Sequence, residues 1–152
     1  MEYSYKFRIY PNAEQRALIQ KTFGCSRFVY NHFLAQRISE YKATGKAPTR
    51  FQQYKMLTSL KREILWLKEV DSIPLQAELQ NLDSAYQGFF RRVKKGEKPG
   101  FPRFKSKRDR RKSYKTKQHI TNGKPTIYVD DKHIRLCLLY TSPSPRDRTR
   151  SR

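Results

Sequence analysis

Residues that could hold a metal or form a disulfide are scarce in this 152-residue sequence. The two cysteines, Cys25 and Cys137, are isolated, with no C-x-x-C pair and no histidine at ligand spacing. Because zinc sites and disulfide frameworks need clustered cysteines, we expect neither, and lone thiols are typical of a reducing compartment. The N-terminal stretch MEYSYKFRIY is not a signal peptide, and no apolar run approaches membrane-spanning length.

Catalytic patterns are also lacking. The 13 acidic residues are scattered except for Asp130-Asp131, which lie in an expected turn, whereas metal-dependent phosphodiester cleavage needs several converging carboxylates. His32, His119 and His133 are isolated from one another, and the chain has no phosphate-binding loop, dinucleotide fingerprint or nucleophile elbow. We therefore expect no catalytic residue and no metal ligand in this chain.

Positive charge is abundant and concentrated. The chain has 34 Lys and Arg residues and a net charge of +21, and an aromatic content of 13% argues against wholesale disorder. Residues 91–117 contain fourteen basic and two acidic residues, so this stretch is expected to bind phosphate backbones. The candidate nucleic-acid-binding residues here are Arg91, Arg92, Lys94, Lys95, Arg103, Lys105, Lys107, Arg108, Lys112, Tyr114 and Lys117.

Two other interpretations of this stretch stay open. A charge run can simply be solvated, although solvated runs usually mix both signs, and a membrane surface is a further polyanion, although the cations form no amphipathic helix face. The interleaved rings of Phe101, Phe104 and Tyr114 could either stack on bases or anchor the stretch to the core.

Hydrophobic periodicity predicts a strand, then helices, then more strands. Residues 3–9 alternate as in a half-buried strand, and helices are expected at 12–24, 26–45, 49–64 and 72–96, with capping boxes at Asn12 and Thr49. Gly24 could end or bend the first helix, and Ser72 with Pro74 opens the last. Strands are expected at 114–120 and 126–129, and a second hairpin should pair 127–129 with 133–136 across Asp130-Asp131.

This order predicts an α+β fold in which a helical block is inserted into a small sheet or barrel. The expected parts are a first strand (1–11), a helical domain (12–97), a basic segment with further strands (98–136) and a disordered or foreign tail (137–152).

Four strings, FRIYPNAEQ, FGCSRFVYNHFL, LQAELQNLDSAYQGFFRRVKKG and GFPRFKSK, occur in an order that resembles the N-terminal half of the TnpB (OrfB) family of transposon-encoded RNA-guided DNA endonucleases. The resemblance covers about Tyr3 to Leu136. It implies a split, wedge-like β-barrel with an inserted four-helix recognition domain, and it implies guide RNA and target DNA as partners in a prokaryotic cytoplasm, at the nucleoid. It also implies that Ser72, Gln76, Arg50 and Tyr54 face a target-adjacent motif; a Gln amide can pair with adenine.

The sequence departs from the family at Cys137, beyond which the family continues into a RuvC-type nuclease with three carboxylates and a four-cysteine zinc element. Magnesium and zinc are thus implied only for that missing half, and no cofactor is expected here. We predict a nucleic-acid-binding fragment without a nuclease domain. The alternatives are a stand-alone helix-turn-helix accessory factor of a transposon, a ribosomal-type RNA-binding protein and a non-functional fragment.

Overall fold

The computed structural model describes residues 1–136, which adopt an α+β fold. Its helices are α1 (Ala13–Thr44), α2 (Arg50–Glu63), the short 3-10 helix η1 (Leu65–Glu69) and α3 (Ser72–Lys95). Four short strands follow, β1 (Ile120–Thr121), β2 (Lys124–Pro125), β3 (Tyr128–Val129) and β4 (Ile134–Arg135). The chain divides into two compact units: Met1–Gln20 together with the chain from Lys117 onward, and Lys21–Thr116, which we call the helical unit.

Helix α1 is one continuous helix of 32 residues, so the prediction of two helices separated near Gly24 is wrong. It begins as predicted: the Gln15 amide N–H donates to the side chain of Asn12, and the Asn12 N–H donates to the side chain of Gln15, each at 2.9 Å. A glycine inside a helix lowers stability by only about 0.5–1 kcal/mol relative to alanine, because its more flexible backbone loses more entropy on folding. This penalty is too small for Gly24 to interrupt the helix. Buried residues on both sides of it, Thr22 and Cys25, hold the helix together.

The ends of α2 and α3 are set by local sequence. Thr49 and Gln52 form the predicted capping box at the start of α2. Helix α3 is capped by Asp71, one residue before the expected Ser72, because the Asp71 carboxylate accepts a hydrogen bond from the Ile73 N–H. Gly96, with φ of 70°, ends α3 as predicted.

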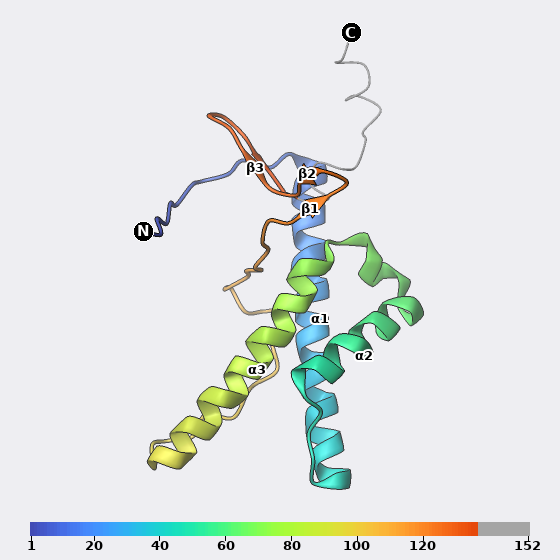
Figure 1. Cartoon of the computed structure of the whole chain (residues 1–152), viewed down its shortest axis with the longest axis vertical. Helices are drawn as coiled ribbons and strands as arrows, with labels where there is room; N and C mark the ends of the chain where they lie inside the picture. The colour runs from blue at the N-terminus through green and yellow to red at the C-terminus, as the bar shows by residue number, and fades with distance from the viewer. Residues whose placement is uncertain (137–152) are drawn as a thin grey trace. The chain divides into compact units, whose positions relative to one another are not determined.

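The core of the helical unit lies where α2, η1 and α3 pack on α1 (Figure 1). Its fully buried apolar side chains come from α1, η1 and α3 and are Val29, Phe33, Leu34, Leu67, Leu75, Leu79 and Leu82, and α2 adds the buried Leu57 and Gln53. The apolar face of α3 is buried as far as Tyr86 and then becomes exposed, since Val93 is 51% exposed. The predicted five-turn apolar stripe is therefore core at one end and surface at the other.

A buried arginine joins the three long helices. Arg37 of α1 donates from Nε to Gln53 of α2 at 3.2 Å and from Nη2 to Asp83 of α3 at 3.1 Å. Its guanidinium also lies over the ring of Tyr86, 4.8 Å from the centroid. Gln53 in turn donates to the Phe33 carbonyl, so this network is satisfied by partners from each helix.

The other unit contains two hairpins. β1 pairs with β2 across Asn122-Gly123, whose positive φ values of 51° and 73° give the primed turn that suits a two-residue hairpin. β3 pairs with β4, with Tyr128 opposite Arg135 and Val129 opposite Ile134, as predicted. The expected strand at 114–120 is reduced to Ile120–Thr121.

The predicted first strand is not formed: residues 1–12 have no regular secondary structure, and Tyr3 and Tyr5 are 73% and 75% exposed. An extended segment without a pairing partner cannot satisfy its backbone groups as a strand. Within residues 1–136 the sheets are two separate two-stranded hairpins, not a closed barrel. The tail predicted at 137–152 lies outside the described residues, and in the described part no helix is long and apolar enough to cross a bilayer.

Candidate nucleic-acid interface

After Gly96 the chain turns back and runs alongside α3 in the opposite direction (Figure 1). Three contacts mark its path: Arg92 Nη2 donates to the Gly100 carbonyl at 3.0 Å, Lys105 reaches Glu78, and the Thr116 hydroxyl donates to the Asp71 carboxylate at 3.1 Å. We call residues 98–116 the returning segment. It has no helix or strand of its own, so these contacts determine its position on the helical unit.

Lys105 is the central anchor of the returning segment. Its Nζ lies 2.5 Å from the carboxylate of Glu78, whose side chain is only 2% exposed, and 4.4 Å from the centroid of the Tyr30 ring. The side-chain amide of Asn31 makes two hydrogen bonds with the Lys105 backbone, at 2.7 and 2.9 Å. Burial and the nearby Glu78 carboxylate raise the pKa of Tyr30, so its ring stays neutral beneath the ammonium. The ammonium of Lys105 is thus paired with Glu78, and the predicted contact of this residue with phosphate stays a prediction.

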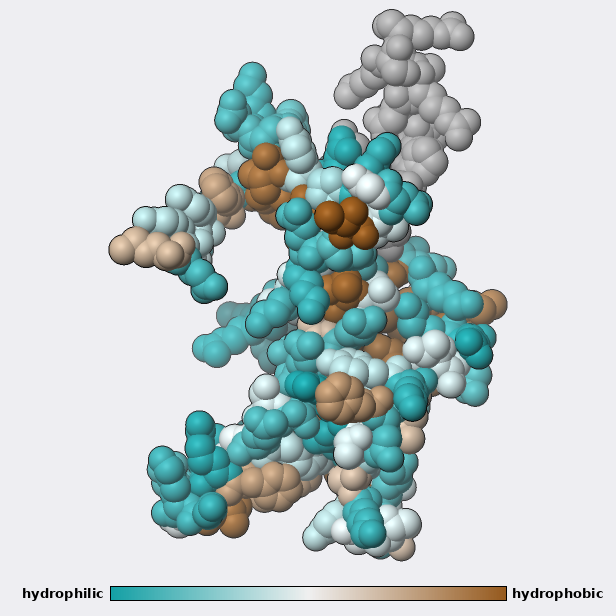
Figure 2. Space-filling view, in the orientation of Figure 1, coloured by the Kyte–Doolittle hydropathy of each residue, from teal (hydrophilic) through white to brown (hydrophobic). Residues whose placement is uncertain are grey.

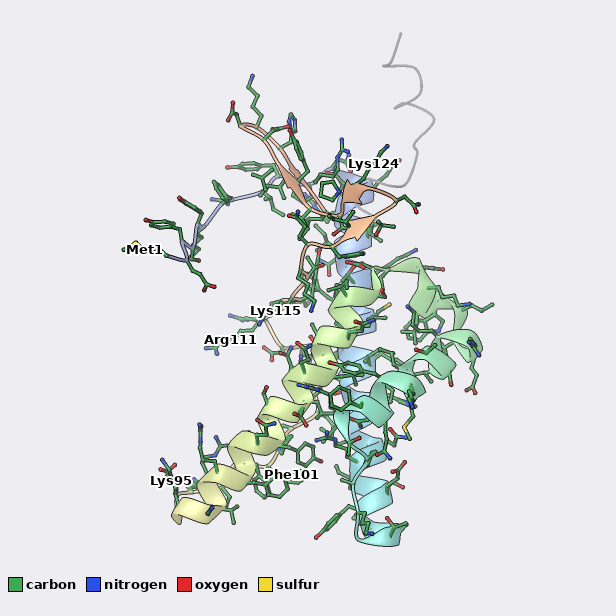
Figure 3. The ribbon with its side chains drawn as sticks, in the orientation of Figure 1. Met1, Lys95, Phe101, Arg111, Lys115 and Lys124 are labelled. Carbon is green, nitrogen blue, oxygen red and sulfur yellow. The ribbon has the colours of Figure 1, made fainter. Side chains whose placement is uncertain are left out.

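Aromatic side chains hold the two ends of the returning segment. Phe101 makes edge contacts with Tyr86 and Phe89 of α3, at 5.6 and 5.3 Å between centroids, and Figure 3 shows it against the far half of α3. Tyr114 makes an edge contact with Phe23, and burial raises the pKa of its hydroxyl. Both rings therefore anchor the segment, whereas Phe104 is 57% exposed and makes no ring contact among the described residues.

Most of the predicted cations are exposed. Figure 2 shows hydrophilic side chains gathered over the far end of α3, and in Figure 3 Arg111 and Lys115 project away from the helices. Arg92 is partly buried because its guanidinium holds Gly100. The exposed predicted residues of the helical unit are Arg91, Lys94, Lys95, Arg103, Lys107, Arg108 and Lys112, and the structure adds Lys98, Arg110, Arg111 and Lys115. Lys117 is also exposed but belongs to the other unit.

The four residues assigned to a target-adjacent motif lie at the starts of α2 and α3. Gln76 is exposed, while Ser72, Arg50 and Tyr54 are partly buried. The Arg50 guanidinium lies over the Phe51 ring at 5.3 Å, and its buried Nε has no hydrogen-bond partner in the described chain. No hydrogen bond, ion pair or ring contact between described residues joins Arg50 or Tyr54 to Ser72 or Gln76, and their joint contact with a target-adjacent motif stays a prediction.

A small hollow of about 90 Å³ lies between α1 and the returning segment. Arg27, Arg111 and Lys112 line it together with the acidic Glu78 and Asp109. The hydroxyl of Ser26, a residue only 2% exposed, also lines it and has no partner within residues 1–136.

A larger open groove of about 700 Å³ lies between α1 and η1. Phe28 forms its aromatic wall, 4.9 Å from Trp66 edge to face and 5.7 Å from His32 in a stacked arrangement. Lys21 and Glu69 form an ion pair of 3.0 Å at its rim, and Gly24 and Cys25 line it from α1. Burial, and then the Glu69 carboxylate, raise the pKa of Cys25, so its thiol is poorly nucleophilic. No sequence pattern indicated this groove, because its two walls are more than thirty residues apart in the chain.

Nothing in residues 1–136 gathers three or more His, Cys, Asp or Glu side chains into a metal-binding group. The described side chains thus offer no donor set for the magnesium or zinc that the resemblance implies for the family's other half, and we derive no step through either ion.

Comparison with known proteins gives consistent relatives. A family model described as a helix-turn-helix domain, from OrfB proteins of IS605 elements, matches residues 1–46. The chain is 36% identical over 129 residues to a candidate RNA-guided DNA endonuclease of Streptomyces pristinaespiralis and 33% identical over 106 residues to InsQ of Escherichia coli K12, named in the same way. These matches cover 82% and 68% of this chain.

The lengths of these relatives differ. The chain spans 31% and 25% of the two proteins named as endonucleases, but 91% of the virulence protein VsdF of Salmonella dublin, to which it is 34% identical over 111 residues, 67% of this chain. The ordered strings, the family model and these relatives agree, which confirms the resemblance. The chain therefore belongs to the OrfB family, also called TnpB, of transposon-encoded proteins.

Proposed function

We propose that this chain is a nucleic-acid-binding module whose exposed cations on the end of α3 and the returning segment grip a phosphate backbone. The observation that carries the proposal is the combination of charge and anchoring. Residues 91–116 contain thirteen basic and two acidic residues, and Lys105, Phe101 and Tyr114 fix the backbone that presents them. Cations held on an ordered backbone bind phosphates with less loss of conformational entropy than a flexible tail does.

The partners that we propose are a guide RNA and its target DNA. Support comes from the names of two relatives, which describe RNA-guided DNA endonucleases, and from the surface position of Gln76 at the start of α3. An exposed side-chain amide can reach a base edge, and a Gln amide matches the donor and acceptor pair of adenine. In this proposal Gln76, with Ser72, Arg50 and Tyr54, reads the target-adjacent motif.

We assign no cleavage step to the described residues. Phosphodiester hydrolysis by metal ions needs converging carboxylates, and residues 1–136 contain no cluster of that kind. Our proposal for this chain is therefore binding without catalysis.

The finer architecture is also part of the proposal. Tyr3, Tyr5, Phe7 and Ile9 alternate along one segment, and apolar side chains of the hairpins, such as Ile120 and Val129, are exposed in the same unit. We propose that these side chains are those that a split, wedge-like barrel buries once its strands pair, with the residues of the helical unit as its inserted recognition domain.

Salt dependence of binding tests the phosphate contacts. Affinity for a structured RNA and for a DNA duplex would be measured from about 50 to 300 mM salt, with the full chain and with a Lys107→Ala/Arg108→Ala double variant. Each phosphate contact that is lost should flatten the slope of log affinity against log salt by about 0.7–0.9. Lys105 is left intact because its charge is already paired with Glu78.

The matched control is Lys42→Ala/Lys46→Ala, which removes the same charge from exposed positions at the far end of α1. It should leave the slope nearly as it is in the parent chain. Equal slopes for the parent and the Lys107→Ala/Arg108→Ala variant would remove the returning segment from the interface.

A stand-alone helix-turn-helix factor is the second candidate, favoured by the description of the family model that matches residues 1–46. In this structure those residues hold a single helix, α1, and no second helix that could enter a major groove. Tighter binding to a palindromic duplex than to structured RNA would favour this candidate.

A further inference from the structure

We propose that the groove between α1 and η1 receives an unstacked nucleobase of a single-stranded nucleic acid. This inference rests on the proposed function, because it adds a base-stacking site to a module that grips phosphates. All lining residues lie in the helical unit, between Lys21 and Glu69.

The first argument is the chemistry of the wall. Phe28, His32 and Trp66 form a continuous set of rings, with centroid separations of 4.9 and 5.7 Å. Trp66, the single tryptophan of the chain, is 45% exposed. Its neighbour in η1, Leu67, is fully buried, so η1 packs on the core while leaving the indole at the surface. An exposed indole in a groove of about 700 Å³ offers both the surface and the volume that a planar base needs.

The second argument is the charge around the rings. The side chain of Arg27 makes no hydrogen bond or ion pair within the described chain, and it lines both this groove and the small hollow beside the returning segment. Arg111 and Lys112 line that hollow, together with the unpartnered Ser26 hydroxyl. A nucleotide with its base in the groove would place its phosphate within reach of Arg27. Charge complementarity, in a chain of net charge +21, thus selects a nucleic acid over a neutral apolar partner.

The third argument is the shape of the α1 side of the groove. Gly24 lines it, and a Cβ atom added there would meet nothing within 4 Å. The absence of a side chain at this position leaves room for a flat ligand, although glycine weakens a helix interior. It also provides a substitution that fills the groove without disturbing a packed neighbour.

Trp66 gives a direct readout, since it is the only tryptophan. We would titrate the full chain with a short single-stranded RNA, with the DNA of the same sequence and with an abasic DNA of equal length, and follow tryptophan fluorescence and affinity together. Stacking should quench the fluorescence with RNA, DNA or both, and the abasic strand should bind through its phosphates without that quenching. The RNA and DNA arms identify which sugar the site accepts.

Two substitutions at one position separate blocking from helix effects. Gly24→Leu should abolish the quenching and weaken binding of the base-containing strand about tenfold, the loss of one stacked base, with little effect on the abasic strand. Gly24→Ala adds a single methyl group at the same position, so it should reduce quenching and affinity far less than Gly24→Leu does. Phe51→Ala, which removes an exposed ring of α2, should leave both unchanged.

The outcomes separate the two proposals. Equal quenching by the abasic strand, or full affinity and quenching in Gly24→Leu, would overturn the base site while the phosphate grip stands. If neither the base-containing nor the abasic strand binds at low salt, the proposed function fails and the base site fails with it.

Discussion

Lys105 is a residue whose surroundings in the structure differ from those that the sequence suggests. In a run of cations it looks like a phosphate ligand, yet its ammonium faces the buried carboxylate of Glu78 and the ring of Tyr30. Removing one partner of such a pair leaves a charge without compensation in a poorly solvated place. Within residues 1–136 the exposed cations around it have no such partner, and they remain available for a ligand.

We therefore expect Lys105→Met to destabilise the chain by about 2–3 kcal/mol, somewhat less than for a fully buried pair because water reaches the ammonium. Urea unfolding followed by circular dichroism would measure it. Lys107→Met, two residues away and exposed, should change the free energy of unfolding by less than about 0.5 kcal/mol. A Lys105→Met/Glu78→Gln double variant should recover part of the lost stability. Equal free energies of unfolding for Lys105→Met and Lys107→Met would refute the anchoring role of Lys105.

At the scale of elements, α1 is the longest helix and passes through Gly24 without a break. Alanine there should stabilise the chain by about 0.5–1 kcal/mol, since it removes the backbone entropy of glycine and its Cβ meets open space. Thermal unfolding would show a higher midpoint than that of the parent chain. Gly96→Ala is the opposite case, because its φ of 70° strains any L-residue, and it should lower the midpoint.

The β3–β4 hairpin carries a pH dependence. The Asp130 carboxylate accepts hydrogen bonds from the N–H groups of Lys132 and His133, at 2.8 and 2.6 Å, and these bonds lower its pKa below the ordinary 3.8. Because the pKa of Asp130 is lower in the folded hairpin than in the unfolded chain, its ionised carboxylate stabilises the hairpin above about pH 4. This stabilisation is lost as the pH falls through the folded-state pKa.

Cross-strand contacts between Tyr128 and Arg135, observed by NMR, should therefore persist at neutral pH and fade in acid. In an Asp130→Asn variant they should be weaker at neutral pH and nearly independent of acid. Contacts in the parent chain that stay constant to about pH 2 would contradict this role of the turn.

At the scale of the whole molecule, the net charge of +21 opposes folding through self-repulsion. Thirteen cations lie within residues 91–116, on the end of α3 and on the returning segment, and this stretch contains only two acidic residues. Added salt screens this repulsion, so the melting temperature should rise between low ionic strength and about 0.3 M sodium chloride. The rise should be smaller for a chain with Lys107, Arg108 and Lys112 changed to Ala. A melting temperature that falls with salt would show that attractive pairs dominate instead.

What the sequence determined by itself is local. The capping boxes at Asn12 and Thr49, the glycine stop at Gly96 and the β3–β4 turn form as predicted, because each depends on residues three or four positions apart. The concentration of positive charge is likewise a property of composition, and the ordered strings identified the family.

Only the tertiary structure decided which side chains are left for a ligand. Glu78 is 27 residues from Lys105, Asn31 is 74 residues from it, and Trp66 meets Phe28 across two helices, so no periodicity could pair them. The same reason applies to the first segment. Alternation predicted a strand at 3–9, but a strand needs a neighbouring strand, and no strand of the described chain pairs with these residues. Local patterns are set by short-range geometry, whereas neutralised charges, grooves and strand pairing depend on long-range packing.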